Sequence, residues 1–402
     1  MQIDRCSFAF TLLLGLLAAV PACGIDMILP ALSATGASLG VPPAKAGLAM
    51  SVYLLSLGAT PLVFGPVSDR YGRKPLLVLG SAVLVIGGLG CATSHSLPVL
   101  LAWRAVQGAG AASLSMSMAI IRDLYEGRVA HQKMSHVIVA INVVPMIAPL
   151  AGAQLLAAGG WRLLYVVLTA LGFILLLVTS LGFAESATPD PGRRLTPSGM
   201  LHDYLRVFRH PLCRGYILIS SAAMGAIFAY VAGSSLFLVD VVGLTPFQYG
   251  LTFGLTAIAV MSGAWIDGRL SARGSPAGAI LAAGLVLLVL ASAALLSMTL
   301  AGWMPAPLAV LAMIGATFAF GLIAPNVANR AMQPLPQIAG AVGSAAGCAQ
   351  MLAAAAASGL VSVLFDGHSA LSMSAFMLFF AILAAFAYVY LVRPEGRTAM
   401  VP

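Results

Sequence analysis

A water-soluble domain cannot be built from this amino-acid composition. The chain has 402 residues, of which 60% are hydrophobic and only 8% are charged, whereas soluble domains carry roughly 25% charged residues. The net charge of +8 does not indicate nucleic-acid binding, because the Lys and Arg residues lie in short loops between apolar segments rather than in a basic arm.

Twelve apolar segments are long enough to cross a bilayer, which takes about 20 residues each. They are residues 8–30, 46–66, 76–94, 98–121, 135–158, 161–183, 213–238, 246–267, 276–298, 306–329, 338–363 and 370–392. We expect the first to be a retained helix rather than a cleaved signal peptide, because its apolar run continues past Cys23 to Pro30. The sequence therefore predicts an all-α membrane protein of twelve transmembrane helices in two six-helix halves.

A long polar stretch, residues 184–212, separates the sixth and seventh segments and contains Pro189, Pro191 and Pro197. We expect an N-terminal half over 1–183, a cytoplasmic linker over 184–212 and a C-terminal half over 213–402. Within the linker, residues 198–209 predict a short amphipathic helix on the membrane surface.

The Lys and Arg residues are distributed unequally between the two sets of loops, and this asymmetry predicts the orientation, since such residues gather on the cytoplasmic side. One side has only Lys45 and Arg162. The other side, which includes both termini, has Arg5, Arg70, Arg73, Lys74, Arg122, Arg128, Lys133, Arg193, Arg194, Arg206, Arg209, Arg214, Arg269, Arg273, Arg330, Arg393 and Arg397. We therefore expect both termini and the linker to be cytoplasmic, in a multi-pass protein of a bacterial inner membrane.

The two halves repeat one pattern. GPVSDRYGRKP at 65–75 follows the second segment, and GAWIDGRLSARG at 263–274 follows the eighth. Each has a Gly, then an Asp, then spaced arginines at the end of the second helix of its half. Parallel repeats of this kind are typical of secondary transporters.

Two charged residues lie well within predicted spans, Asp26 in the first and Arg104 in the fourth. A charge at the centre of a membrane helix costs about 2.5–3.5 kcal/mol on insertion scales, so it usually faces a cavity or the bundle interior. If the first helix ends near residue 33, both charges lie at similar depth. Pro21 and Pro30 favour bends on either side of Asp26. We interpret Asp26 as a proton-binding carboxylate in a water-accessible pocket, where Arg104 could influence its charge.

Several motifs together resemble one known family. GPVSDRYGRKP is similar to the loop signature between helices two and three of the major facilitator superfamily, and LLAWRAVQGAGAAS at 100–113 is similar to its fourth-helix signature. Four further stretches resemble the bicyclomycin/chloramphenicol resistance branch of drug:proton antiporters within that superfamily. They are GIDMILPAL at 24–32, IIRDLYEGR at 120–128, APLAG at 148–152 and IAPNVANRAM at 323–332.

The resemblance implies roles for particular residues. Asp26 would be the acid that couples proton to substrate, and Arg104 would be the fourth-helix arginine, with Gln107 and Gly108 in the same motif. A cytoplasmic gate motif would comprise Gly65, Asp69, Arg70, Gly72, Arg73, Lys74 and Asp123. In that gate Asp69 would interact with the start of helix eleven and Arg73 would pair with Asp123.

The fifth-helix antiporter motif departs from the family pattern. Pro145, Pro149 and Gly152 match it, but Ala148 stands where a Gly usually precedes the proline. Arg330 places a charge at the end of helix ten where a neutral residue is expected. Candidate substrate-pocket residues, each as often used for helix packing, are Asn142, Met146, Tyr230, Ser234, Phe237 and Gln350.

These features predict a proton-coupled efflux transporter for small amphipathic drugs or metabolites. The partners would be the small-molecule substrate, protons and the lipid bilayer, with no nucleic acid, and we expect a monomer. A proton-coupled uptake carrier is the alternative with the same fold. The sequence contains no Walker motif, catalytic cluster or metal-ligand spacing, so we expect no enzyme activity, no metal and no cofactor.

Overall fold

The computed structural model describes residues 3–5, 7–114, 116–187 and 204–393, and every regular element in these ranges is a helix. Most of the predicted linker, including 198–203 of its expected surface helix, lies outside them; residues 204–209 are helical. The all-α prediction is confirmed. In a bilayer a helix satisfies its own backbone hydrogen bonds, which is why such apolar sequences take this form.

Ten helices of the described ranges are long and apolar enough to cross a membrane. One of them, α8 (Gly127–Gly182), has 56 residues and contains two spans, because the backbone leaves helical geometry at Gly159 and Gly160. A shorter helix, α6 (Leu97–Leu114), is not among the ten and carries Arg104 and Gln107. Each of the twelve predicted segments overlaps one of these helices.

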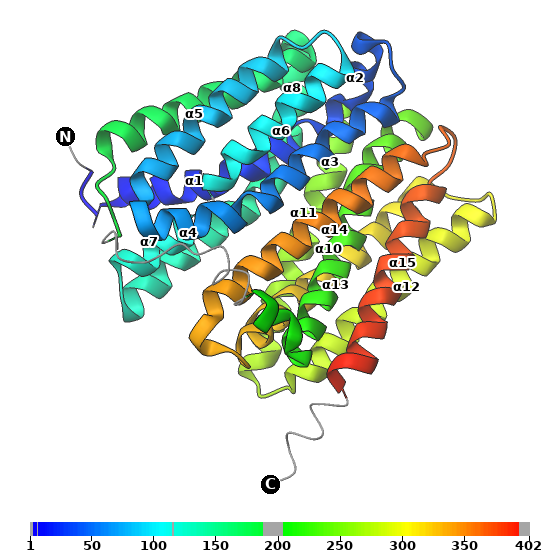
Figure 1. Ribbon diagram of the computed structural model, residues 1–402. Helices are drawn as coiled ribbons and strands as arrows, with labels where there is room; N and C mark the ends of the chain where they lie inside the picture. The colour runs from blue at the N-terminus through cyan, green and yellow to red at the C-terminus, as the bar shows by residue number, and fades with distance from the viewer. Residues whose placement is uncertain (1–2, 6, 115, 188–203, 394–402) are drawn as a thin grey trace. The chain divides into compact units, whose positions relative to one another are not determined.

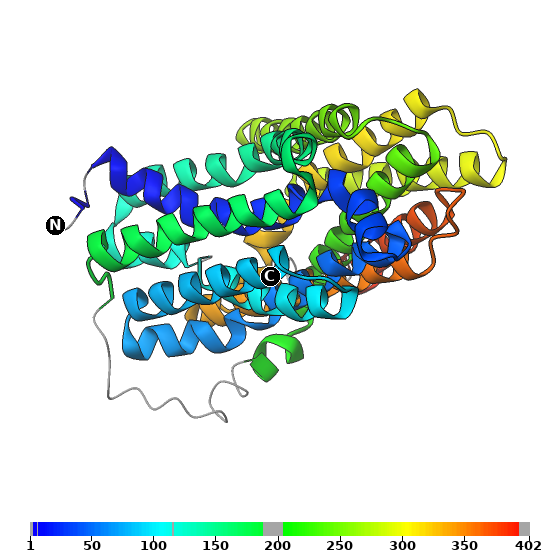
Figure 2. The same cartoon turned by 90° about the horizontal axis from the view of Figure 1, so that it is seen from above.

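The chain divides into two compact units, Met1–Leu195 and Thr196–Pro402. The first contains α6 and α8 together with α1 (Phe8–Asp26), η1 (Leu29–Ala31), α2 (Leu32–Leu39), α3 (Pro43–Ala59), α4 (Pro61–Tyr71), α5 (Arg73–Ala92) and α7 (Ser117–Leu124). Helix α6 packs between α3 and α5 (Figure 1). Helix α1 packs along α8, which also contacts α5 (Figure 2).

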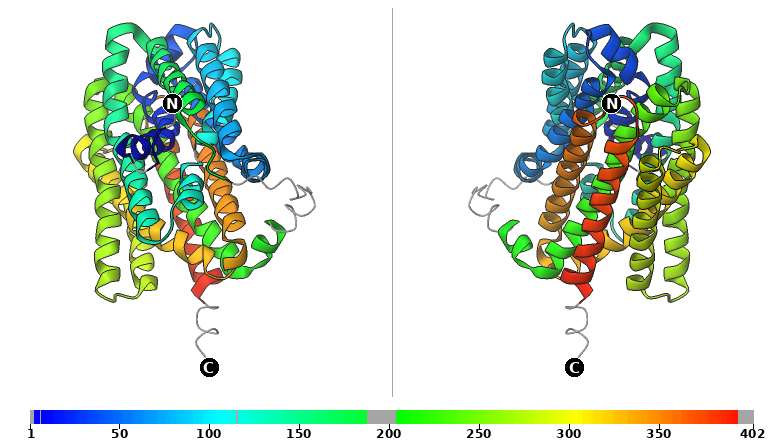
Figure 3. Two further views of the ribbon diagram at one scale, coloured as in Figure 1. Left: turned by 90° about the vertical axis from the view of Figure 1, so that its left-hand side faces the viewer. Right: turned by 90° about the vertical axis from the view of Figure 1, so that its right-hand side faces the viewer.

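The second unit is built around α10 (Pro211–Ser235), whose span is the most buried of the ten. Its other elements are the π-helix η2 (Leu236–Val241), α11 (Pro246–Ala272), α12 (Ala277–Leu300), α13 (Ala306–Met332), η3 (Pro336–Ile338), α14 (Ala339–Val363), α15 (Leu371–Ala387) and the π-helix η4 (Tyr388–Val392). Helix α10 packs against α13, α14 and α15, and the last two lie side by side (Figure 3).

Helix starts follow local chemistry. Pro43, Pro61, Pro211 and Pro246 occupy first-turn positions, where the missing N–H has no intrahelical partner to lose. Thr245 and Gln248 form a capping box at the start of α11 by exchanging backbone and side-chain hydrogen bonds. Pro43, Pro211 and Pro246 therefore mark the starts of spans, whereas Pro61 lies inside the span Pro43–Gly65.

The first span is longer than its sequence suggests. It continues to Leu39, so the predicted end at residue 30 is wrong. The α-helix itself ends at Asp26, a 3-10 turn containing Pro30 follows, and α2 then runs to Leu39 and is capped by Gly40, which has a positive φ of 65°. Asp26 therefore lies at a break inside a 32-residue span rather than near its outer end.

The junction inside α8 yields a stability prediction. Gly160 has φ of 75°, a left-handed conformation that costs an L-residue about 1–2 kcal/mol. We expect Gly160→Ala to lower the thermal unfolding midpoint in detergent. Gly347→Ala is the control, because a methyl group there meets open space in α14. Equal unfolding midpoints for the two variants would contradict this assignment of strain.

Candidate functional site

Asp26 is the last residue of α1 and lies in an apolar environment. Its side chain is 7% exposed. Among the residues that the structure describes, its carboxylate has no hydrogen-bond or ion-pair partner. Burial without a partner is costly for a charged carboxylate, and such a group is readily neutralised by a proton.

Arg104 is fully buried, and its guanidinium is held from three sides. Nε donates to the Ala49 carbonyl at 3.1 Å, Nη2 donates to the Gly24 carbonyl at 2.9 Å, and Nη1 donates to Gln107 Oε1 at 2.6 Å. The guanidinium also lies 4.1 Å from the centroid of the Tyr53 ring. This geometry combines charge-assisted hydrogen bonds with a cation–π contact.

The two intramembrane charges lie at the same level but do not form an ion pair in this structure. The Arg104 contact with Gly24 brings the guanidinium to a residue two positions before Asp26. The Gly24 carbonyl belongs to the last turn of α1, where carbonyls lack intrahelical partners. Tyr53 on α3 donates to the Pro21 carbonyl, one turn earlier in α1, at 3.0 Å. Helix α6 therefore satisfies the Gly24 carbonyl at the break, and α3 holds the turn before it.

Two glycines of the predicted motifs permit close packing around this break. A Cβ on Gly108 would lie 2.5 Å from the Tyr53 carbonyl oxygen, so this glycine lets α6 approach α3. A Cβ on Gly152 would collide with the Met27 carbonyl oxygen. The proline-containing part of α8, with Pro145 and Pro149 inside the helix, thus packs against the residue that follows Asp26.

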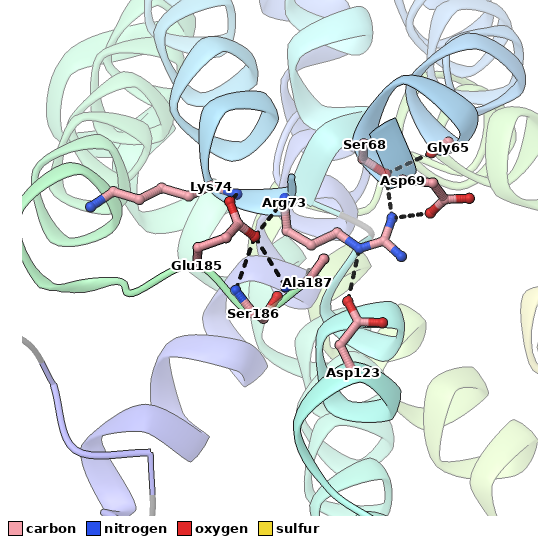
Figure 4. Close-up of polar contacts among 9 residues, drawn as sticks. All are labelled: Gly65, Ser68, Asp69, Arg73, Lys74, Asp123, Glu185, Ser186 and Ala187. Atoms are coloured by element: carbon pink, nitrogen blue, oxygen red, sulfur yellow. Dashed lines mark hydrogen bonds and ion pairs between the residues drawn. The ribbon is translucent and has the colours of Figure 1, made fainter. Parts of the chain in front are cut away.

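The gate-motif residues gather at the start of α5, and we call Ser68, Asp69, Arg73 and Asp123 the Arg73 cluster (Figure 4). Arg73 forms ion pairs with Asp69 at 2.8 Å and Asp123 at 2.9 Å, and also donates to the Ser68 hydroxyl. The Ser68 hydroxyl in turn donates to the Gly65 carbonyl at 2.6 Å. The structure thus brings Arg73 and Asp123 together, joining α4, α5 and α7.

The remaining motif cations make different contacts. Arg70 lies over the ring of Tyr71, 5.3 Å from its centroid. The backbone N–H of Lys74 donates a hydrogen bond to the Glu185 carboxylate at 3.1 Å.

Glu185 is a partner of this region that the sequence analysis missed. Its carboxylate accepts hydrogen bonds from the backbone N–H groups of Arg73 at 2.8 Å and Lys74 at 3.1 Å. Gly72, with φ of 98°, leaves the space that the carboxylate occupies. Position alone gave a weak signal, because Glu185 follows the sixth span and looks like the first polar residue of a linker.

Three pocket candidates of the second unit are buried, and two of them, Tyr230 and Ser234, are hydrogen-bonded to α11. Tyr230 and Thr256 share a hydrogen bond at 2.6 Å, and Ser234 and Tyr249 share one at 3.2 Å. Phe237 is 4% exposed at the start of the π-helix η2. These contacts join α10 to α11.

Other candidates are more dispersed. In the first unit Asn142 donates to the Ile138 carbonyl of its own helix at 2.8 Å, and Met146 is partly buried one turn further on. In the second unit Gln350 is partly buried on α14, and Arg330 donates to the Tyr216 hydroxyl at 3.3 Å. Asn142 and Met146 thus lie one turn apart on α8, whereas Gln350 and Arg330 lie on different helices of the second unit.

A family model described as Major Facilitator Superfamily matches residues 14–358. The chain belongs to the major facilitator superfamily. Its similarity to the resistance branch is also borne out. A Haemophilus influenzae bicyclomycin resistance protein homolog is 24% identical over 90% of this chain and 91% of its own length. A Pseudomonas aeruginosa chloramphenicol resistance protein is 32% identical over 69% of this chain and 65% of its own length.

Two further matches cover nearly the whole chain. The uncharacterized MFS-type transporter YdgK of Bacillus subtilis is 29% identical over 97% of this chain and 96% of its own length. The solved structure of the xylose transporter XylE from E. coli has a TM-score of 0.71 at 17% identity, covering 96% of this chain and 97% of that one. As a major facilitator protein, the chain is a multi-pass membrane transporter of small molecules and not an enzyme.

The contacts of Arg104 predict that lysine cannot replace it. An ammonium group cannot reach Ala49, Gly24 and Gln107 together, so buried acceptors would be left unsatisfied at a cost of at least about 2 kcal/mol. We expect Arg104→Lys to lower the free energy of unfolding, measured by chemical denaturation in detergent. Arg162→Lys is the control, since Arg162 donates at 3.0 Å to Ser94 in a partly exposed position. A smaller loss for Arg104→Lys than for the control would refute this account.

Proposed function

We propose that this major facilitator protein is a proton-coupled antiporter that exports small amphipathic drugs or metabolites across the bacterial inner membrane. The observation that carries the proposal is the buried Asp26 carboxylate, which has no partner among the described residues. Intramembrane carboxylates of this kind serve as proton relays in transporters. The names of the relatives, which refer to bicyclomycin and chloramphenicol resistance, support drugs as the substrate class.

The break after Asp26 supports a coupling role for this residue. Interrupted helices are tolerated in membranes where they line a cavity or are buried in protein, and transporters use them at ion and substrate sites. Asp26 would take up a proton from the outside and release it to the inside. Substrate and proton would bind in mutual exclusion, so that each lowers the affinity for the other.

Arg104 would act as a fixed charge near Asp26. Its donors are already engaged by Ala49, Gly24 and Gln107, so it need not follow the proton. The guanidinium would therefore hold the end of α1 in place while Asp26 binds and releases a proton in each cycle.

The Arg73 cluster would close the cytoplasmic side in the outward-facing state. Its ion pairs join α4, α5 and α7 within the first unit. Asp69 would also engage the start of the eleventh predicted segment, residues 338–363. We further propose cytoplasmic termini, a cytoplasmic linker over 184–212 between halves 1–183 and 213–402, and a monomer. The remaining pocket candidates, Asn142, Met146, Tyr230, Ser234, Phe237 and Gln350, would contact substrate.

The test is drug-triggered proton movement in inverted vesicles energised by respiration. We expect added drug to release protons from the lumen of wild-type vesicles, and Asp26→Asn to abolish this release because the amide cannot carry a proton. Asp366→Asn is the control, since Asp366 lies in a loop and accepts hydrogen bonds from its own turn. Preserved coupling in Asp26→Asn would rule out the assigned proton site. Drug accumulation by intact cells instead of exclusion would favour an uptake carrier.

A further inference from the structure

Glu185 lies three residues after the end of α8, yet its carboxylate is tied to a different helix. One oxygen accepts from the Arg73 N–H at 2.8 Å and from the N–H groups of Ser186 at 2.9 Å and Ala187 at 3.2 Å. The other oxygen accepts from the Lys74 N–H at 3.1 Å. Four backbone donors therefore converge on one acid (Figure 4).

The position of this carboxylate matches the electrostatics of a helix start. Arg73 and Lys74 are the first two residues of α5, and their N–H groups have no intrahelical acceptor. The N-cap residue, Gly72, has no side chain to provide one. Glu185 therefore acts as a cap supplied from elsewhere in the chain, and its negative charge also complements the helix dipole.

The chain segment that carries Glu185 is itself held in place. Arg5 donates through Nη2 to the Glu185 carbonyl at 2.9 Å, and Tyr125 donates to the Arg5 carbonyl at 2.5 Å. The Ile3 N–H donates to the Gly182 carbonyl at 2.9 Å. The N-terminal segment, the end of α8 and the residue after α7 thus fix the acid at the start of α5.

This arrangement bears directly on the Arg73 cluster. The same residue, Arg73, gives its backbone N–H to Glu185 and its guanidinium to Asp69 and Asp123. Displacement of the first turn of α5 would move the Arg73 backbone, and both ion pairs depend on its position. Because α8 leads into the residues that connect the two units, Glu185 also ties the start of that connection to the cluster.

We infer that Glu185 is a positioning residue of the cytoplasmic gate, holding the first turn of α5 so that Arg73 can bridge Asp69 and Asp123. The inference rests on the proposed function, which assigns the Arg73 cluster to a cytoplasmic gate. The contacts of Glu185 themselves do not depend on which substrate is transported. The inference assigns Glu185 to the mechanism although its carboxylate forms no ion pair with any residue that the structure describes. Loss of the carboxylate would favour states open to the cytoplasm.

The test uses Cys23, a partly buried native cysteine three residues before Asp26. The other cysteines, Cys6, Cys91, Cys213 and Cys348, are replaced by alanine. Inverted vesicles expose the cytoplasmic face to a membrane-impermeant maleimide, and the rate of Cys23 labelling reports cytoplasmic opening. We expect Glu185→Gln to raise this rate roughly tenfold, because an amide nitrogen would face a backbone N–H and the charge-assisted bonds would be lost.

Two further variants keep the inference falsifiable. Glu185→Asp retains the charge on a shorter side chain, so its labelling rate should fall between those of wild type and Glu185→Gln. If Glu185→Gln fails to accumulate in the membrane, the labelling rate of Glu185→Asp tests the inference in its place. Glu126→Gln makes the same chemical change at an exposed helix-start residue whose side chain forms no cap, and it should label like wild type.

The outcomes separate the two proposals. Wild-type labelling rates in both Glu185 variants would overturn the role of Glu185, and drug-triggered proton release by the wild type would leave antiport standing. Absence of that release from the wild type would remove the proposed function. Faster labelling in the Glu185 variants would then still support a positioning role for this acid in cytoplasmic opening.

Discussion

A single buried guanidinium holds together three helices of the N-terminal unit. Arg104 on α6 donates to Gly24 on α1 and Ala49 on α3, and it also engages Gln107 on its own helix. Burying a cation is costly unless its donors are satisfied. Here backbone carbonyls meet that requirement instead of a carboxylate. The arrangement leaves Asp26 without a fixed counter-ion at the same level of the bundle.

The break in the first span explains how these carbonyls become available. Helix α1 ends at Asp26 and a 3-10 turn follows, so the carbonyls of the last turn lack their usual partners. Arg104 satisfies the Gly24 carbonyl, Tyr53 donates to the Pro21 carbonyl one turn earlier, and Gly152 on α8 allows the peptide after Asp26 to pack closely. The break after Asp26 therefore has two effects. It places the titratable Asp26 at the end of a helix, and it provides the carbonyl through which Arg104 holds that helix end in place.

Much of this was predictable from residue type. The twelve spans, Asp26 and Arg104 follow from hydropathy and from the rarity of charges in apolar runs, and the family motif drew attention to Arg73 and Asp123. The acceptors of Arg104 were not predictable, because backbone carbonyls carry no sequence signal. The continuation of the first span to Leu39 was obscured by Pro30 and by a run of small residues. Glu185 was missed because its partners on α5, Arg73 and Lys74, are backbone N–H groups more than 100 residues away.

The central claim is that Asp26 is the group that exchanges its proton for substrate. The most direct measurement is proton release on drug binding to purified protein in weakly buffered detergent solution, alongside calorimetric binding to the same samples. The account predicts about one proton released per drug bound by the wild type, and none by an Asp26→Asn protein that still binds drug. Equal proton release by the two proteins would contradict it.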